Sequence, residues 1–325
     1  MKPISAVAWL LSGVFLFAAN VSAATTIAVI GKTKNDSFYE QSYAGCLAYA
    51  RDHAEVKCIY DGPADYQDIR GQAWAVASVL EQRVDGILIS TTDSGYLTEH
   101  ALKKARQQNI PVITFDSDLM PEDQSYRLAY VGTNNFDYGV ALGGYANKFR
   151  ANKFRAKNFN KAGTTEICIQ SGHKTTPNLN DRIRGVRYAL SGNQGTERLE
   201  GQNGWVESHR CPFYTGGKRN ASVLQLEYIL SKNTASVFLA VAGFAQFSPD
   251  YIERIMPFKH LIDSSQVAVI SADTEAIQLK ALKAGLSTIN IGQRPYEMGR
   301  LGAELIHDFI KNGIRPAQEF YYLDF

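Results

Sequence analysis

Short apolar runs alternate with amphipathic stretches along most of this 325-residue chain. Continuous apolar runs of this length, bounded by turn residues, are typical of strands that are buried on both faces of a sheet. On this pattern we expect strands at Thr26–Gly31, Val56–Tyr60, Gly86–Ser90, Val112–Phe115, Leu128–Val131, Glu166–Gln170, Val237–Val241, Val267–Ile270 and Ser287–Ile291.

Between these runs, apolar residues recur three or four positions apart, as Ala73, Val76 and Leu80 do, and this spacing predicts helices. Regular alternation of strand and helix implies parallel sheets with helices on both faces. Such sheets bind ligands beyond the carboxyl ends of their strands, so the residues that follow each strand are the candidates for function. We expect further helices around Tyr39–Ala50, Leu97–Ala105, Tyr138–Phe149, Asp181–Leu190, Ala221–Leu230, Glu275–Ala284 and Met298–Lys311.

The N-terminus has the pattern of a secretory signal peptide. Lys2 precedes an apolar run that extends to Ala18, and the small residues Val21-Ser22-Ala23 follow. We therefore predict a signal peptide over residues 1–23, cleavage after Ala23 and a periplasmic location. The alternative is an uncleaved membrane anchor, but the apolar stretch is shorter than the roughly 20 residues that a membrane-spanning helix needs.

The numbers of basic and acidic residues are nearly equal. The chain has 34 Lys and Arg against 32 Asp and Glu, which gives no reason to expect nucleic acid or an acidic membrane surface as a partner.

The four cysteines permit disulfides in an exported chain. We favour the pairs Cys46–Cys58 and Cys168–Cys211 because each is then local to one presumed domain; the alternative is that Cys46 and Cys168 are buried thiols.

Motifs for catalysis and metal binding are missing from the sequence. It contains no Gly-x-Ser-x-Gly elbow, no phosphate-binding loop and no Gly-x-Gly-x-x-Gly after the first strand. It also lacks Cys-x-x-Cys, and its six histidines are scattered. We therefore expect no catalytic residues, no cofactor and no metal, and an exported enzyme on this fold is the least favoured interpretation.

One basic segment, Lys148–Lys161, contains Lys-Phe-Arg-Ala twice. It is either a surface for a partner or, as we favour, a solvated helix end whose phenylalanines dock on the domain.

Several segments that follow predicted strands together resemble the periplasmic sugar-binding proteins of the ribose/galactose type. The first runs from Ile30 to Tyr39 and ends in paired aromatics, and the second ends at Ser90. The third, Asn109-Ile110-Pro111-Val112-Ile113-Thr114-Phe115-Asp116-Ser117-Asp118, is the most similar. The remaining two are Gly292-Gln293-Arg294-Pro295, which resembles the family's Gln-x-Pro segment, and Asp181-Arg182-Ile183-Arg184-Gly185, which resembles its Arg-x-x-Gly turn.

The resemblance implies an α/β fold of two doubly wound parallel-sheet lobes joined by three hinge crossings, the type I periplasmic binding protein fold. The N-terminal lobe is expected to comprise 24–131 and 293–318, and the C-terminal lobe 132–292 and 319–325. The crossings are expected at Val131–Asn134, Asn290–Gln293 and Ala317–Phe320. Phe320–Phe325 is expected to add a strand to the second lobe.

The resemblance also implies a ligand-binding set, in which aromatic rings stack on a sugar and polar groups bind its hydroxyls. The expected members are Lys32, Asp36, Phe38, Tyr39, Ser90, Asp116, Ser117, Arg182, Asp273 and Gln293. For Phe38 and Tyr39 the alternative is core packing at a helix start. The chain also departs from the family pattern, because Ser117 replaces an Arg and Val241-Ala242-Gly243 lacks the usual Asn.

The implied function is a monomeric periplasmic solute-binding protein that closes on a small polar ligand, a monosaccharide, and delivers it to an ABC importer. The alternative is a ligand-sensing subunit that reports to a membrane histidine kinase, as TorT-like and LuxP-like relatives of the family do.

Overall fold

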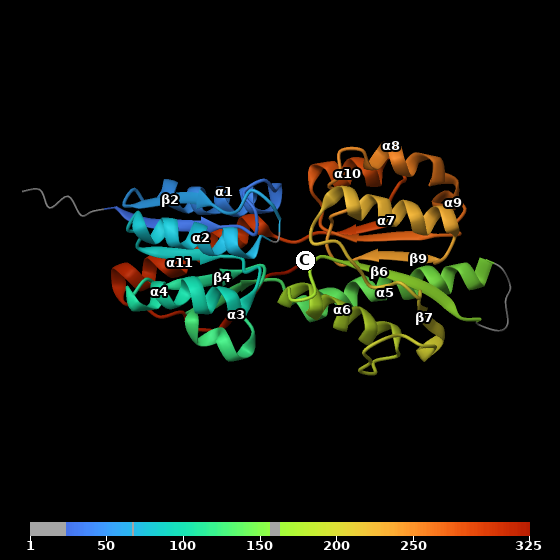
Figure 1. The fold of residues 1–325 in the computed structure, drawn as a ribbon, viewed down its shortest axis with the longest axis horizontal. Coiled ribbons are helices and arrows are strands. Elements are labelled where there is room, and N and C mark those ends of the chain that lie inside the picture. The colour runs from blue at the N-terminus through green and yellow to red at the C-terminus, as the bar shows by residue number, and fades with distance from the viewer. Residues whose placement is uncertain (1–23, 67, 157–162) are drawn as a thin grey trace, which may run out of the picture.

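The computed structural model describes residues 24–66, 68–156 and 163–325, and in it the chain forms two α/β lobes that lie side by side (Figure 1). The predicted signal peptide, 1–23, lies outside the described residues, as do residues 157–161 of the basic segment.

The first lobe is built on a six-stranded parallel sheet with the strand order β12-β5-β4-β3-β1-β2. The apolar runs of its central strands, Ile27–Ile30, Gly86–Ile89 and Val112–Phe115, are buried, as the sequence pattern predicted. The strands of this sheet are β1 (Thr25–Ile30), β2 (Val56–Asp61), β3 (Gly86–Ile89), β4 (Val112–Phe115), β5 (Ala129–Gly132) and β12 (Phe320–Tyr322).

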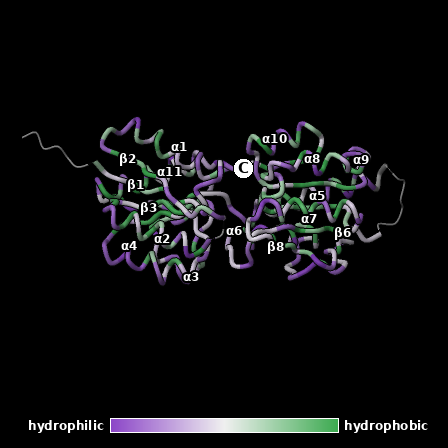
Figure 2. Tube along the Cα trace, turned by 45° about the horizontal axis from the view of Figure 1, so that its top comes forward, coloured by the Kyte–Doolittle hydropathy of each residue, from purple (hydrophilic) through white to green (hydrophobic). Residues whose placement is uncertain are grey.

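Helices cover both faces of this sheet because successive residues of a strand point to opposite sides. Ile27 and Val29 pack in the cluster that holds α1 and α11, whereas Ala28 and Ile30 pack with α2 and the α3–α4 segment. The hydrophobic residues accordingly gather along the strands in Figure 2. The helices of this lobe are α1 (Ser37–Asp52), α2 (Ile69–Glu81), α3 (Ser94–Leu97), the π-helical turn η1 (Thr98–Leu102), α4 (Lys103–Gln107), the 3-10 helix η2 (Pro121–Tyr126) and α11 (Pro295–Asn312).

The second lobe is built on another parallel sheet, with the order β11-β10-β9-β6-β7 and β8 also paired to β6. Alternate residues again divide between two faces: Ile167 and Ile169 pack with α5 and α6, and Cys168 packs with α7 and α8. The strands of this sheet are β6 (Thr165–Ser171), β7 (Trp205–Glu207), β8 (Phe213–Tyr214), β9 (Val237–Ala240), β10 (Ala268–Ala272) and β11 (Ile289–Ile291).

The helices of the second lobe include the long α5, which carries the described part of the basic segment. Across the described ranges, no helix combines the length and the apolar character needed to cross a membrane. The helices of this lobe are α5 (Asn135–Ala156), α6 (Pro177–Leu190), the 3-10 helix η3 (Gln202–Gly204), α7 (Arg219–Lys232), α8 (Tyr251–Ile255), the 3-10 helix η4 (Met256–Phe258), α9 (Lys259–Asp263) and α10 (Ala276–Lys283).

Every strand predicted from the apolar runs is present, with each end within two residues of its expected position. The sequence pattern did not predict the short strands β7 and β8. The predicted α/β class with two parallel sheets is confirmed.

The C-terminal strand lies in the other lobe from the one we expected. β12 pairs with β5 of the first sheet, so the assignment of 319–325 to the second lobe is wrong. Backbone hydrogen bonds to β5 hold it at both of its ends, since Tyr130 N donates to Glu319 O (2.9 Å) and Leu323 N donates to Gly132 O (2.8 Å). The chain therefore does not pass from one lobe to the other at Ala317–Phe320, where the third crossing was expected. It ends at the junction of the lobes, where the Phe325 ring contacts that of Tyr138, 5.1 Å away.

Both predicted disulfides are confirmed. Cys46 on α1 is bonded to Cys58 on β2, and Cys168 on β6 is bonded to Cys211. Each pair ties together elements of one lobe.

Candidate functional site

A cavity lies between the lobes, at the carboxyl ends of strands from both sheets. Its volume is about 30 Å³, far below the roughly 300–1,000 Å³ of small-molecule sites, so in this closed arrangement it has room only for water-sized molecules, and a larger ligand requires the lobes to move apart. The residues that line it are Asp36, Phe38, Tyr39, Tyr66, Asp116, Asn178, Leu179, Arg182, Ala242, Gly243, Phe244, Phe247, Asp273 and Gln293.

Asp116 is the most densely hydrogen-bonded carboxylate of this cavity. It directly follows β4 and is 4% exposed. Ser90 Oγ donates to its Oδ2 (2.7 Å), as does the Tyr39 hydroxyl (3.3 Å), and Asn178 Nδ2 donates to its Oδ1 (3.2 Å). Because Ser90 and Tyr39 belong to the first lobe and Asn178 to the second, this carboxylate is held from both lobes.

Two cations compensate the buried charge of Asp116. Lys32 Nζ lies 3.5 Å from Oδ2, and Arg182 Nη2 lies 3.7 Å from Oδ1. Burial lowers the pKa of Lys32 to about 8, while the nearby Asp116 opposes this shift. Lys32 also donates to Asn178 Oδ1 (3.1 Å), so this ammonium links the two lobes.

Arg182 and Gln293 connect this carboxylate to a second one. Arg182 Nη2 donates to Gln293 Oε1 (2.8 Å), and Gln293 Nε2 donates to Asp273 Oδ1 (2.7 Å). Burial raises the pKa of Asp273 above its ordinary value, and Arg182 opposes that shift. The result is a continuous polar network of acceptors and donors along one side of the cavity.

Aromatic rings from both lobes supply the apolar lining. Phe38 and Tyr39 come from the start of α1, and Phe244 and Phe247 follow β9. The Phe38 and Tyr39 rings meet edge to face, at an interplanar angle of 73°, so together they do not form one flat platform. Tyr66 contacts both Tyr39 and Phe244, with ring centroids 6.5 and 4.8 Å away. The aromatic lining is therefore a connected set of rings to which both lobes contribute.

The structure brings most of the predicted site residues together. Three of them do not line the cavity: Lys32 and Ser90 lie behind Asp116 and contact it, whereas Ser117 is fully buried and its carbonyl accepts a hydrogen bond from the Thr91 hydroxyl (3.1 Å). Those that line the cavity are Asp36, Phe38, Tyr39, Asp116, Arg182, Asp273 and Gln293.

Sequence reasoning missed other lining residues, notably Tyr66, Asn178, Phe244 and Phe247. Each follows a strand of its sheet: Tyr66 follows β2, Asn178 follows β6, and the two phenylalanines follow β9. A stricter use of the rule that ligands bind after parallel strands would have found them.

Direct contacts hold the lobes closed over the cavity. Gln41 Nε2, on the first lobe, donates to both carboxylate oxygens of Glu275, on the second (2.8 and 2.7 Å). Arg219 of the second lobe pairs with Asp36 of the first, with Nη2 3.4 Å from Oδ2. The cavity is thus enclosed by polar contacts that can separate without disrupting either core.

In the part of the chain that the structure describes, two connections join the lobes, one between β5 and α5 and one between β11 and α11. They lie beside each other, since Thr133 Oγ1 of the first donates to Gln293 Oε1 of the second (2.9 Å). Gln293 therefore belongs both to the cavity and to a connection between the lobes.

Comparison with known proteins places this architecture in a family. Residues 27–314 match the model of a periplasmic binding protein domain. Among solved structures, the chain is similar to an ABC transporter solute-binding protein from Burkholderia graminis in complex with D-arabinose (24% identity, TM-score 0.73, covering 93% of this chain and 94% of that one). It is also similar to one from Agrobacterium vitis bound with α-D-tagatopyranose (18%, 0.74, 91% and 92%) and one from Actinobacillus succinogenes with bound D-allose (17%, 0.70, 92% and 95%).

Proposed function

The chain belongs to the periplasmic binding protein family, and on that premise we propose that it is a solute-binding protein whose lobes close on a monosaccharide. The observation that carries the proposal is Asp116, a buried carboxylate that reaches the cavity amid donors from both lobes and aromatic rings. Sugar hydroxyls donate to carboxylates, and the apolar faces of a sugar ring stack on aromatic side chains.

The balance of charge favours a neutral ligand over a charged one. Asp36, Asp116 and Asp273 line the cavity. Their charges are opposed by Arg182 in the cavity, by Lys32 behind it and by Arg219 at its rim. An uncharged polyol exchanges hydrogen bonds with these groups and leaves no charge unpaired, whereas an ionic ligand would have to disrupt an existing pair.

The many polar groups that line the cavity also favour an uncharged ligand with several hydroxyls. Each polar group that is left unpaired in a closed cavity costs about 1–3 kcal/mol, so the ligand must match the donors and acceptors around it. Asn178 and Arg182 can donate to the ring and hydroxyl oxygens of a sugar, while the three carboxylates accept from its hydroxyls.

As partner we propose an ABC importer, since the three solved structures named above are solute-binding proteins of ABC transporters. We propose a periplasmic location, with residues 1–23 removed as a signal peptide. Periplasmic extraction followed by N-terminal sequencing tests this, and should return a mature protein that begins at Ala24. A full-length protein in the membrane fraction would contradict it.

The ligand class is tested by isothermal titration calorimetry against a panel of aldoses and ketoses that includes D-arabinose, D-tagatose and D-allose. At least one sugar should bind with a stoichiometry of one. Asp116→Asn and Arg182→Gln should each weaken that binding about tenfold or more, because hydrogen bonds to charged groups contribute about 1.5–3 kcal/mol.

Arg184→Gln is the matched control, since Arg184 lies on the same helix but is exposed and pairs with Asp181. Its sugar affinity should equal that of the unmodified protein. Binding of amino acids or dicarboxylates with no sugar response would contradict the proposal.

A further inference from the structure

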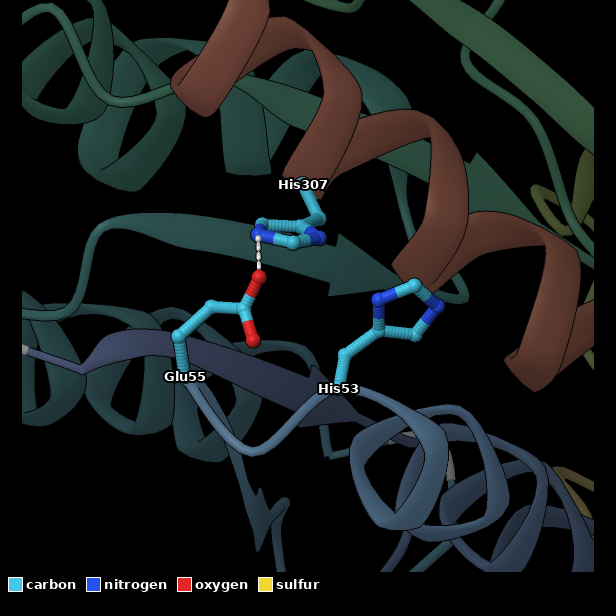
Figure 3. Close-up of side chains that lie close together, drawn as sticks. All are labelled: His53, Glu55 and His307. Atoms are coloured by element: carbon cyan, nitrogen blue, oxygen red, sulfur yellow. Dashed lines mark ion pairs between the residues drawn. The ribbon is translucent and has the colours of Figure 1, made fainter.

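A cluster of metal-ligating side chains lies outside the cavity, on the first lobe (Figure 3). His53 caps the C-terminus of α1, Glu55 lies in the turn that leads to β2, and His307 projects from the later part of α11. In Figure 3 the Glu55 carboxylate points toward the His307 ring, and the His53 ring lies beside both. Three elements thus direct one potential ligand each toward a common point.

The geometry is close to that of a zinc site. One ligand atom from each residue can be chosen so that all three lie within 4.8 Å of one another. In a tetrahedral zinc site the ligand atoms are about 3.3 Å apart, from bond lengths of about 2.0–2.2 Å. His307 Nε2 and Glu55 Oε1 are 3.7 Å apart, near that spacing. The half-buried His53 ring stacks on the Tyr49 ring, 4.1 Å away, and has to move closer to the other two ligands to complete the site.

His307 has a buried nitrogen without a hydrogen bond. The residue is 3% exposed, and its Nε2 has no hydrogen-bond partner. Its other ring nitrogen, Nδ1, lies 2.9 Å from the Tyr49 hydroxyl. In the tautomer that carries its proton on Nδ1, the ring donates a hydrogen bond to that hydroxyl. Nε2 then keeps a free lone pair, which is directed at Glu55. A histidine that binds a metal is commonly oriented in this way through its second nitrogen.

The backbone around the cluster is held firmly. The Cys46–Cys58 disulfide links α1 to β2 on either side of His53 and Glu55. α1 and α11 pack so closely that a Cβ added at Gly299 would lie 1.7 Å from Ser42 O. The positions of the three residues are therefore set by the lobe itself.

Electrostatics at this point favour a cation. The cluster lies at the C-terminal end of α1 and near that of α11, where helix dipoles present partial negative charge. Glu55 supplies a full negative charge, which now pairs with the Lys311 ammonium. Lys311 is 52% exposed, so its release into solvent costs little. A metal ion would replace it.

We propose that His53, Glu55 and His307 bind a zinc ion that links α1 to α11. Two imidazoles and one carboxylate are a ligand set that Zn²⁺ accepts, with water at the fourth position. About 18 Å of helix separates His307 from the start of α11 at the cavity, from twelve residues at about 1.5 Å each. Zinc binding is therefore independent of the sugar site, and either proposal can fail alone.

The test is titration of tag-free, chelator-treated protein with Zn²⁺ alone, followed by calorimetry and thermal denaturation. One zinc ion should bind and raise the melting temperature. His53→Gln and Glu55→Gln should each weaken zinc binding at least about tenfold, and Co²⁺ should give the visible spectrum of a tetrahedral site. Because His307→Gln changes a buried residue, the two more accessible variants carry the test.

Two further variants test whether zinc binds at this cluster and not at another histidine. Lys311→Met should tighten zinc binding, because it removes the cation that competes for Glu55. His100→Gln is the matched control, since His100 is an exposed histidine beside Glu99 on another helix, and it should leave the affinity unchanged. Absence of zinc binding, or equal affinity in the unmodified protein and in both His53→Gln and Glu55→Gln, would overturn the proposal.

Discussion

Asp116 and Asp273 occupy matching positions in the two lobes, since each is the first residue after a buried parallel strand and each has positive φ, 57° and 71°. Asp116 N donates to Val131 O (3.3 Å), and Asp273 N donates to Ile291 O (2.6 Å), in both cases on the adjacent strand. Left-handed backbone is uncommon for residues other than glycine, although Asp tolerates it better than most. The two lobes thus use the same strained turn to direct one carboxylate each into the shared cavity.

The contact between Gln41 and Glu275 is predicted to stabilise the closed state without touching the ligand. Gln41→Ala should weaken monosaccharide binding about tenfold, since a hydrogen bond to a charged group contributes about 1.5–3 kcal/mol. Calorimetry measures the effect. Gln82→Ala is the control, because the Gln82 amide donates only to Ser78 on its own helix, at 3.3 Å. Equal affinities in the two variants would show that this contact does not assist closure.

Asp36 is predicted to make folding stability depend on pH. Burial raises the pKa of Asp36 to about 6, and the hydrogen bond from Phe38 N and the charge of Arg219 oppose this shift only in part. Because the folded state binds the proton more tightly than the unfolded state, the contribution of this group is greatest below its ordinary pKa. That contribution is lost as the pH rises through 6.

The variant that isolates this effect is Asp36→Asn, which does not titrate and can still cap α1. The free energy of unfolding of Asp36→Asn should rise relative to that of the unmodified protein by about 2 kcal/mol between pH 4 and pH 7. Denaturant titrations of ligand-free protein at several pH values measure it. A difference that stays constant over this range would contradict the assignment.

The two disulfides are predicted to differ in their effect on stability. They close loops with sequence separations of 12 and 43 residues, for which chain entropy gives about 3 and 4 kcal/mol. Replacing Cys168 and Cys211 together by Ala should therefore lower the free energy of unfolding slightly more than replacing Cys46 and Cys58. Denaturant unfolding under non-reducing conditions measures both, and losses below about 1 kcal/mol would contradict the prediction.

Much of the fold could be predicted from the sequence because buried parallel strands leave a strong signal. The run Val112–Phe115 is apolar throughout and bounded by Pro111 and Asp116, so both its type and its limits could be read. β8, of two residues, is too short to carry a pattern. Phe320–Tyr322 was recognisable as a strand, but the choice of sheet depends on backbone hydrogen bonds, which side-chain identity does not specify.

The sites could be predicted only where position along the chain implies position in space. Asp116 and Asp273 each directly follow a strand, so the position of each at the carboxyl edge of its own sheet was expected. His53 and His307 are far apart in the sequence and lie on different helices, and only the packing of α1 against α11 brings them together. No spacing rule reveals such a cluster.

The central claim is that Asp116 and Arg182 bind a monosaccharide between aromatic rings of the two lobes. A crystal structure of the protein with the tightest-binding sugar of the panel tests this most directly. We predict sugar hydroxyls within hydrogen-bond distance of the Asp116 carboxylate and the Arg182 guanidinium, with the sugar ring against Phe38 or Phe244. A sugar bound elsewhere, or one that contacts neither Asp116 nor Arg182, would contradict the account.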